Sequence, residues 1–274
     1  MKVGYQGVHG AFSEMACLLY FKDQAFEQVC FKDFISMFEA VAAQKIDYAL
    51  FPVENTTTGL ISRTYDYFQK YDVHVVGEIN VPIIQNLIVL PNTKLEEIRE
   101  VYSHPEALSQ CANFFQKHRG MKEVAYEDTA LAVEYIKQCK DPSKAAIASS
   151  RAAEYYGMEI LQPSVQENDF NMTRFLCVTK EEEIVEGANK ISIRMVLPHV
   201  PGALYSALGL FASKNINVVK LESRPIIGKL FEYCFYVDFM GNREDPDVKE
   251  TLRRLEYDSL DLQIFGNYKA AEIL

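Results

Sequence analysis

The chain has 274 residues, 49% of them hydrophobic, which suffices for one large domain or two ordinary ones with well-filled cores. Its formal net charge of −10, without a lysine or arginine stripe, argues against a nucleic-acid partner. The sequence contains no apolar run of about 18 residues, so we expect no membrane span. It begins on a strand-like segment, residues 2–5, with no apolar secretory leader, and we therefore expect a cytoplasmic protein.

The six cysteines and five histidines show no pattern typical of a metal site or a disulfide framework. No two cysteines have Cys-x-x-Cys spacing and most lie in apolar segments, which favours buried, reduced thiols. The histidines also lack metal-ligand spacing. Gly4, Gly7 and Gly10 do not form the G-x-G-x-x-G fingerprint, so a dinucleotide site is not expected.

Residues 1 to about 180 alternate short apolar runs with helical patterns, which predicts an α/β region with mostly parallel sheets. The expected strands are 2–5, 47–51, 73–76, 85–90, 101–103, 124–126, 145–148 and 175–179. The expected helices are 13–21, 33–43, 105–117, 129–139 and 150–156. Chain crossings near 80–90 and 160–175 indicate two lobes with a cleft, although one continuous sheet fits the same pattern.

The charged residues 180–189 form a plausible linker, after which the pattern changes. The expected strands are 191–197, 217–222, 231–239 and 260–264, and the expected helices start near Pro201 and at 245–246. The order β-α-β-β-α-β within about 80 residues predicts a ferredoxin-like domain.

A polar sequence turns into a strand-forming one at residues 171–178, where Thr173 and Arg174 are adjacent. Arg174 carries a fixed cation suited to a carboxylate, and Thr173 is a small donor that can be held rigidly beside it. A second polar cluster, residues 54–59, follows another apolar strand. Each pattern has a simpler interpretation when taken alone, since a Thr-Arg pair is more often a surface ion pair and an Asn or Thr after a strand is more often a helix cap.

Taken together and in chain order, the motifs resemble those of the monofunctional bacterial prephenate dehydratase family, in which an ACT regulatory domain follows a catalytic domain. The matching segments are 4–7, 10–14, 51–56, 103–108, 110–111, 145–149, 171–175, 201–204 and 222–225. Two positions depart from the pattern, because Thr56 stands where the family often has Ser and Tyr205 where it often has Val.

The resemblance implies a two-lobed, periplasmic-binding-protein-like α/β catalytic domain over residues 1–180 and a ferredoxin-like ACT domain over residues 190–270. It also implies a reaction in which prephenate loses water and carbon dioxide to give phenylpyruvate on the route to phenylalanine. Formation of an aromatic ring drives this reaction, so the site needs no metal, redox cofactor or covalent nucleophile, and we expect none. It needs rigid anion binding and a hydrogen-bond donor at the departing oxygen.

For the catalytic site, the resemblance implies that Thr173 lies nearest the departing hydroxyl and that Arg174 pairs with a carboxylate or orients the loop. Glu54 and Glu127 also match the family, and a carboxylic acid in a dry cleft can act as the proton source. The substrate-binding candidates are Asn55, Thr56 at an expected helix start, Ser103, Gln110 and Phe175. His104 is interpreted as structural, because it precedes Pro105 at a helix start and the reaction does not require an imidazole.

For the regulatory half, the resemblance implies that phenylalanine binds between two ACT domains and inhibits the enzyme by feedback. The candidate effector-binding residues are Gly202, Ala203, Leu204, Asn215, Leu221, Ser223 and Arg224. We therefore expect a homodimer or a homotetramer.

Two alternatives stay open. An arogenate dehydratase would use the same fold and site on a substrate with an amino group in place of the keto oxygen, and dual specificity is compatible with the sequence. A non-enzymatic amino-acid sensor would also join a two-lobed binding fold to an ACT domain. The joint presence of Thr173, Arg174, Asn55 and Gln110 argues against the sensor, which has no leaving hydroxyl to bind.

No segment precedes Met1 that could form a fused chorismate mutase, so we expect a monofunctional enzyme.

Overall fold

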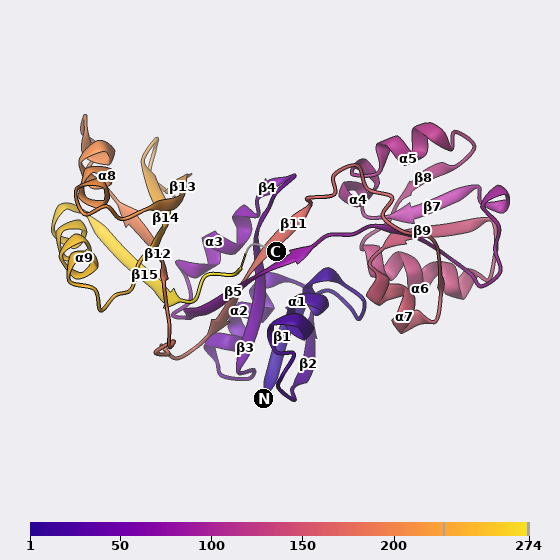
Figure 1. The fold of residues 1–274 in the computed structure, drawn as a ribbon, viewed down its shortest axis with the longest axis horizontal. Coiled ribbons are helices and arrows are strands. Elements are labelled where there is room, and N and C mark those ends of the chain that lie inside the picture. The colour runs from indigo at the N-terminus through magenta and orange to yellow at the C-terminus, as the bar shows by residue number, and fades with distance from the viewer. Residues whose placement is uncertain (227, 273–274) are drawn as a thin grey trace. The chain divides into compact units, whose positions relative to one another are not determined.

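The computed structural model describes residues 1–226 and 228–272 (Figure 1). It forms two compact units, of which the first comprises Met1–Tyr71 with Ile79–Leu176 and the second comprises Asp72–Glu78 with Cys177–Leu274. Among the described residues, no helix is long and apolar enough to cross a membrane.

A first sheet, most of which belongs to the first unit, has the strand order β2-β1-β3-β11-β5, and β1 is parallel to both β2 and β3. Its strands are β1 (Lys2–Gln6), β2 (Glu27–Phe31), β3 (Tyr48–Asn55), β5 (His74–Pro82) and β11 (Met172–Thr179), and the short β4 (Gly59–Leu60) pairs with β3. Strands β5 and β11 each contain residues of both units. The accompanying helices are α1 (Phe12–Tyr20), α2 (Phe34–Ala42) and α3 (Ser62–Phe68).

A second sheet in the same unit has the strand order β10-β6-β9-β7-β8. Its strands are β6 (Asn86–Val89), β7 (Glu100–Ser103), β8 (Lys122–Ala125), β9 (Lys144–Ala148) and β10 (Glu159–Gln162). Its helices are the 3-10 turn η1 (Leu95–Glu97), α4 (Pro105–Ser109), α5 (Ala112–Lys117), α6 (Thr129–Cys139) and α7 (Ser150–Tyr156). The chain passes from β5 to β6 and returns from β10 to β11, so the two-lobed architecture is confirmed and the continuous sheet is wrong (Figure 1). The first sheet and its helices form the first lobe, and the second sheet and its helices form the second lobe.

The expectation of mostly parallel sheets holds only in part. Strand β6, which enters this lobe from the other one, runs antiparallel to both β9 and β10. Strands β7, β8 and β9 are parallel, as the βα alternation predicts.

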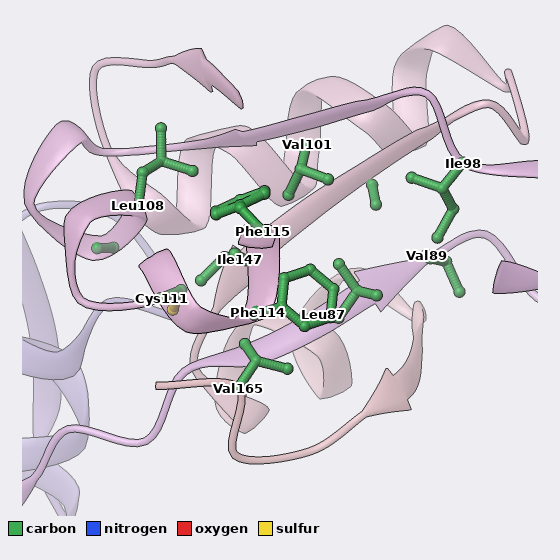
Figure 2. Close-up of a cluster of buried hydrophobic side chains, with 12 residues drawn as sticks. Leu87, Val89, Ile98, Val101, Leu108, Cys111, Phe114, Phe115, Ile147 and Val165 are labelled. Carbon is green, nitrogen blue, oxygen red and sulfur yellow. The ribbon is translucent and has the colours of Figure 1, made fainter. Parts of the chain in front are cut away.

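Residues 105–117 supply part of the core of the second lobe, but they do not form the single helix that the sequence predicts. Leu108, Cys111 and Phe115 are buried together, as their helical spacing predicts (Figure 2). The expected single helix over 105–117 is nevertheless wrong, because it breaks into α4 and α5. The backbone carbonyl of Gln110 accepts from the backbone N–H of Glu167, and the Glu167 carboxylate accepts from the N–H of Asn113, so both groups bond outside the helix.

The second unit contains an antiparallel sheet of strand order β13-β14-β12-β15 and two helices. Its elements are β12 (Lys190–Val196), α8 (Ala203–Ser213), β13 (Val218–Pro225), β14 (Tyr233–Met240), α9 (Pro246–Asp258) and β15 (Asp261–Tyr268). Apolar residues of the helices and of one sheet face form a common core. The ferredoxin-like β-α-β-β-α-β order is confirmed.

Strand β3 is longer than its sequence predicts, because it continues through Pro52 to Asn55. Its pairing with β1 ends at Leu50, so the missing N–H of Pro52 removes no bond to that neighbour. This extension carries Asn55 to the end of a central strand of the first sheet.

Gly10 lies at the contact between the first lobe and α7 of the second. Its φ is +92°, and an added Cβ would lie 2.6 Å from Cα of Ala152. Its carbonyl accepts from Ser149 Oγ at 2.6 Å, and its N–H donates to the buried Glu14 carboxylate at 2.7 Å. This position therefore needs glycine for two reasons, its backbone conformation and the close approach of α7.

We expect Gly10→Ala to lower the free energy of unfolding by roughly 2–6 kcal/mol, the sum of left-handed backbone strain and overpacking. Gly157→Ala is the matched control, since Gly157 has φ of +66° but no atom within 4 Å of an added Cβ, and it should cost only about 1–2 kcal/mol. Urea unfolding of both variants measures the difference. Equal losses would contradict the packing role.

Candidate active site

A cavity of about 550 Å³ lies within the first unit and draws its walls from both lobes. Its size is typical of small-molecule sites. The lining residues are Phe12, Phe34, Pro52, Asn55, Thr58, Leu60, Ile61, Ile83, Gln85, His104, Glu106, Ala107, Gln110, Asp128, Thr129, Thr173 and Phe175. Four of the predicted site residues are therefore brought together here, namely Asn55, Gln110, Thr173 and Phe175.

Asn55 organises the polar wall of this cavity. Its Oδ1 accepts from the backbone N–H groups of Thr57 and Thr58 at 2.9 and 3.0 Å. A backbone N–H can only donate, so this contact identifies the oxygen of the side-chain amide. The Nδ2 of Asn55 must then donate, and it lies 2.8 Å from Asn171 Oδ1 and 2.9 Å from Thr173 Oγ1.

The direction of these hydrogen bonds propagates across the site. Because Asn171 Oδ1 accepts from Asn55, Asn171 Nδ2 donates to Gln110 Oε1, which lies 3.0 Å away. Thr173 Oγ1 already accepts from Asn55, so its own hydrogen is available for donation into the cavity. Gln110 likewise has its oxygen engaged and its amide hydrogens available. The wall thus presents donors toward a ligand.

Arg174 lies on the opposite face of β11 from Thr173 and Phe175, as strand alternation requires. Its Nε is 3.7 Å from Glu54 Oε2, and a terminal nitrogen donates to Tyr65 Oη at 3.3 Å. Arg174 therefore connects β11 to β3 and α3 and does not line the cavity.

The other predicted site residues also lie outside the lining. Glu54 pairs with Arg174 and Glu127 is exposed. Ser103 is fully buried and donates to the carbonyl of Ile147 at 2.6 Å, a structural bond between β7 and β9.

The expected helix start at Thr56 is wrong, because this residue lies in the turn between β3 and β4. Its hydroxyl donates to the carbonyl of Phe170 and accepts from the N–H of Met172. Thr56 therefore joins the turn to the start of β11.

Sequence reasoning missed several residues of the cavity, among them Asn171, which braces it, and the lining residues Gln85, Glu106 and Asp128. His104 caps α4 by accepting from the N–H of Glu106 at 3.3 Å, and it also lines the cavity. The sequence offered one indication of a role for Asn171, namely that it belongs to segment 171–175, which matches the family.

The charge of the cavity wall differs from the expectation of a nearby arginine. Among the described side chains that line it, none is lysine or arginine, whereas Glu106 and Asp128 are carboxylates.

Burial, followed by the charge of Glu167, raises the pKa of the Cys111 thiol to about 12, so this neighbour of Gln110 stays protonated at neutral pH. No group of three or more His, Cys, Asp or Glu side chains within the described ranges could hold a metal ion.

None of the six cysteines, all of which lie in the described ranges, forms a disulfide, and four of them are buried as expected. Cys30 is exposed and Cys139 is partly exposed, so burial does not extend to every thiol.

The predicted effector-binding residues lie in the second unit. Gly202, with φ of +83°, is the N-cap of α8, and Ala203 and Leu204 form its first turn. Asn215, with φ of +54°, follows the other end of α8. The remaining predicted residues, Leu221, Ser223 and Arg224, belong to the edge strand β13.

The architecture and the cavity define a two-lobed α/β protein with a small-molecule site, joined to a ferredoxin-like domain. Residues 3–183 match the family model for prephenate dehydratase, and residues 191–257 match that for the ACT domain. The chain belongs to the prephenate dehydratase family, whose members are lyases.

Individual relatives agree with this assignment. The chain is 37% identical to arogenate dehydratase/prephenate dehydratase 2 of Arabidopsis thaliana over 98% of its own length and 72% of the relative. It is 35% identical to a bifunctional chorismate mutase/prephenate dehydratase of Aquifex aeolicus, covering 99% of the chain and 74% of the relative. A solved prephenate dehydratase from Arthrobacter aurescens, in complex with L-Phe, is 27% identical with a TM-score of 0.89, covering 98% of this chain and 90% of that one.

We expect Asn55→Asp to reduce kcat roughly 100-fold or more, the usual cost of losing one positioned donor. An ionised carboxylate cannot donate, so Thr173 would turn its hydrogen toward the new carboxylate and away from the cavity. Asn113→Asp, on the exposed surface of α5, makes the same chemical change as a control. Steady-state turnover in the dehydratase reaction of the family measures both, and near-normal kcat for Asn55→Asp would refute the assigned bond direction.

Proposed function

We propose that this protein converts prephenate to phenylpyruvate, water and carbon dioxide. In this reaction the bond between the ring and its carboxylate breaks, the electron pair enters the ring, and hydroxide leaves from the opposite carbon. One proton is consumed, because the departing hydroxide must become water. The protein's task is therefore to bind two carboxylates and to stabilise the leaving oxygen.

The observation that carries this proposal is the hydrogen bond from Asn55 to the hydroxyl of Thr173, a residue that lines the cavity. Its oxygen accepts from Asn55, which leaves its hydrogen for the departing oxygen of a bound substrate. A threonine hydroxyl is a weak acid, so we assign Thr173 a hydrogen-bonding role at the leaving group. Such a positioned donor stabilises charge only as it develops, which is the requirement for raising kcat.

The substrate carboxylates need further donors, because the described lining contains no lysine or arginine. The amide of Gln110 has its oxygen occupied by Asn171 and offers its hydrogens to the cavity. Phe175, which is 2% exposed, supplies an apolar wall for the ring. Arg174 and Glu54 act at a distance from the substrate, by holding the ends of β11 and β3 together.

We also propose feedback inhibition by L-phenylalanine, supported by the L-Phe complex of the Arthrobacter relative. Gly202 and Asn215 lie at opposite ends of α8, a helix about 16 Å long. One phenylalanine cannot contact both ends within one chain, so a site that uses both residues takes them from two chains. This supports a homodimer or homotetramer formed through the ACT domains.

The domain limits that we propose are residues 1–180 for catalysis and 190–270 for regulation, in a cytoplasmic enzyme without a bound cofactor. Arogenate is a second candidate substrate, because the Arabidopsis relative is named for both activities and because the lining includes two carboxylates. An assay of phenylpyruvate from prephenate beside phenylalanine from arogenate tests both.

We expect Thr173→Ala to reduce kcat by roughly 100-fold to 10,000-fold with a much smaller change in KM, because the lost donor acts on the leaving group. Thr173→Ser keeps the hydroxyl and should recover most of the activity. Steady-state kinetics with prephenate measure both variants. Near-normal turnover of Thr173→Ala would remove this residue from the chemistry.

We expect Leu221→Ala to weaken phenylalanine inhibition roughly tenfold, since it removes apolar surface from the proposed effector site. Leu221 is 42% exposed, so its truncation should cost little stability. The control is Tyr257→Ala on α9, where the side chain is 88% exposed. The ratio of rates with and without phenylalanine is measured for each variant, and equal inhibition of the two would exclude Leu221 from the site.

A further inference from the structure

Gln85 is a buried polar residue of the cavity that the proposed reaction leaves unused. It lies between β5 and β6, is 2% exposed, and lines the cavity. Its backbone N–H donates to Gln166 Oε1 at 2.9 Å, which fixes the main chain. Its side-chain Nε2 lies 3.5 Å from Gln110 Oε1. Its Oε1 is buried and has no hydrogen-bond partner among the described residues.

The orientation of the Gln85 amide follows from the chain of hydrogen bonds that begins at Asn55. That chain makes Gln110 Oε1 an acceptor, because Asn171 Nδ2 donates to it. Reversing the Gln85 amide would bring its oxygen against the oxygen of Gln110. The nitrogen of Gln85 therefore faces Gln110, and its oxygen is the atom without a donor.

A buried acceptor without a donor is unfavourable, so a bound molecule that supplies one gains affinity. The terminal torsion of a glutamine side chain is soft and the contact with Gln110 is long, so the amide can turn Oε1 toward a ligand in the cavity that Gln85 lines. The cavity also contains Glu106 and Asp128 but no described lysine or arginine side chain, and its lining therefore suits a ligand group that is a donor and positively charged.

The two candidate substrates differ at this kind of group. Both carry two carboxylates and a ring hydroxyl, and that hydroxyl is assigned to Thr173. On the side chain, prephenate offers a keto oxygen, which only accepts, whereas arogenate offers an ammonium, which donates and carries positive charge. We propose that Gln85 Oε1 accepts a hydrogen bond from the side-chain ammonium of arogenate, so that Gln85 determines the preference between amino and keto substrates. The proposal rests on the proposed function of the same site.

The test compares kcat/KM for arogenate and for prephenate in the wild type, Gln85→Met and Gln85→Glu. Gln85→Met keeps the length of the side chain and removes its acceptor, and we expect it to lower the arogenate-to-prephenate ratio roughly tenfold to hundredfold. Gln85→Glu keeps an acceptor and adds negative charge, so it should maintain or raise that ratio. Gln138→Met, on the exposed end of α6, is the matched control and should leave the ratio unchanged.

The outcomes distinguish the proposed role of Gln85 from the proposed dehydratase function. A selective loss of arogenate turnover in Gln85→Met, with the ratio kept in Gln85→Glu, supports the role of Gln85. Equal losses with both substrates, a lower ratio in Gln85→Glu, or a wild type that uses prephenate alone would overturn it while the dehydratase function stands. A wild type that uses neither substrate would overturn the proposed function itself. If Gln85→Met does not fold, the ratio in Gln85→Glu decides.

Discussion

The site depends on one local interaction, the acceptance by Asn55 Oδ1 of the backbone N–H groups of Thr57 and Thr58. A backbone N–H has one possible role in a hydrogen bond, so it imposes a direction on every side-chain amide that follows. The direction passes from Asn55 to Thr173, and through Asn171 to Gln110. A turn at the end of β3 thereby decides which atoms of the cavity wall can donate to a ligand.

The proposed function requires an acidic protein to bind an anionic substrate. At long range the net charge of −10 repels it, although salt screens that repulsion beyond about 8 Å at physiological ionic strength. In that proposal, neutral amide and hydroxyl donors held in one direction bind the substrate at short range, without a cation among the described lining residues. Because such donors are fixed before the substrate arrives, they need no reorganisation during the reaction.

The sequence predicted the ferredoxin-like domain and indicated the two lobes, because hydrophobic alternation and βα order are local patterns. The placement of Asn55 and Thr173 in one site, by contrast, came from the resemblance to the family, since the two residues are 118 positions apart. The sequence did not predict the roles of residues whose partners are remote. Asn171 bonds to Asn55 across 116 positions, and the break between α4 and α5 depends on Glu167, which follows β10. The exclusion of Arg174 from the cavity, by contrast, follows from the period of two along a strand, since its neighbour Thr173 faces inward.

Strand β11, which carries Thr173 and Arg174, offers a physical basis for regulation. Strand β11 carries Thr173 in the first unit and belongs to the second unit from Cys177 onward, while β5 runs from the second unit into the first. The bond between Asn171 and Gln110 spans the two lobes, because Gln110 follows α4 and Asn171 precedes β11. A molecule bound to the second unit can change catalysis only if it binds one arrangement of these strands more tightly than another. Equal affinity for two arrangements would leave their populations unchanged. An arrangement that lengthens the Asn171–Gln110 bond would release the Gln110 amide, whereas Asn55 and Thr173 would keep the direction set by the backbone donors of Thr57 and Thr58.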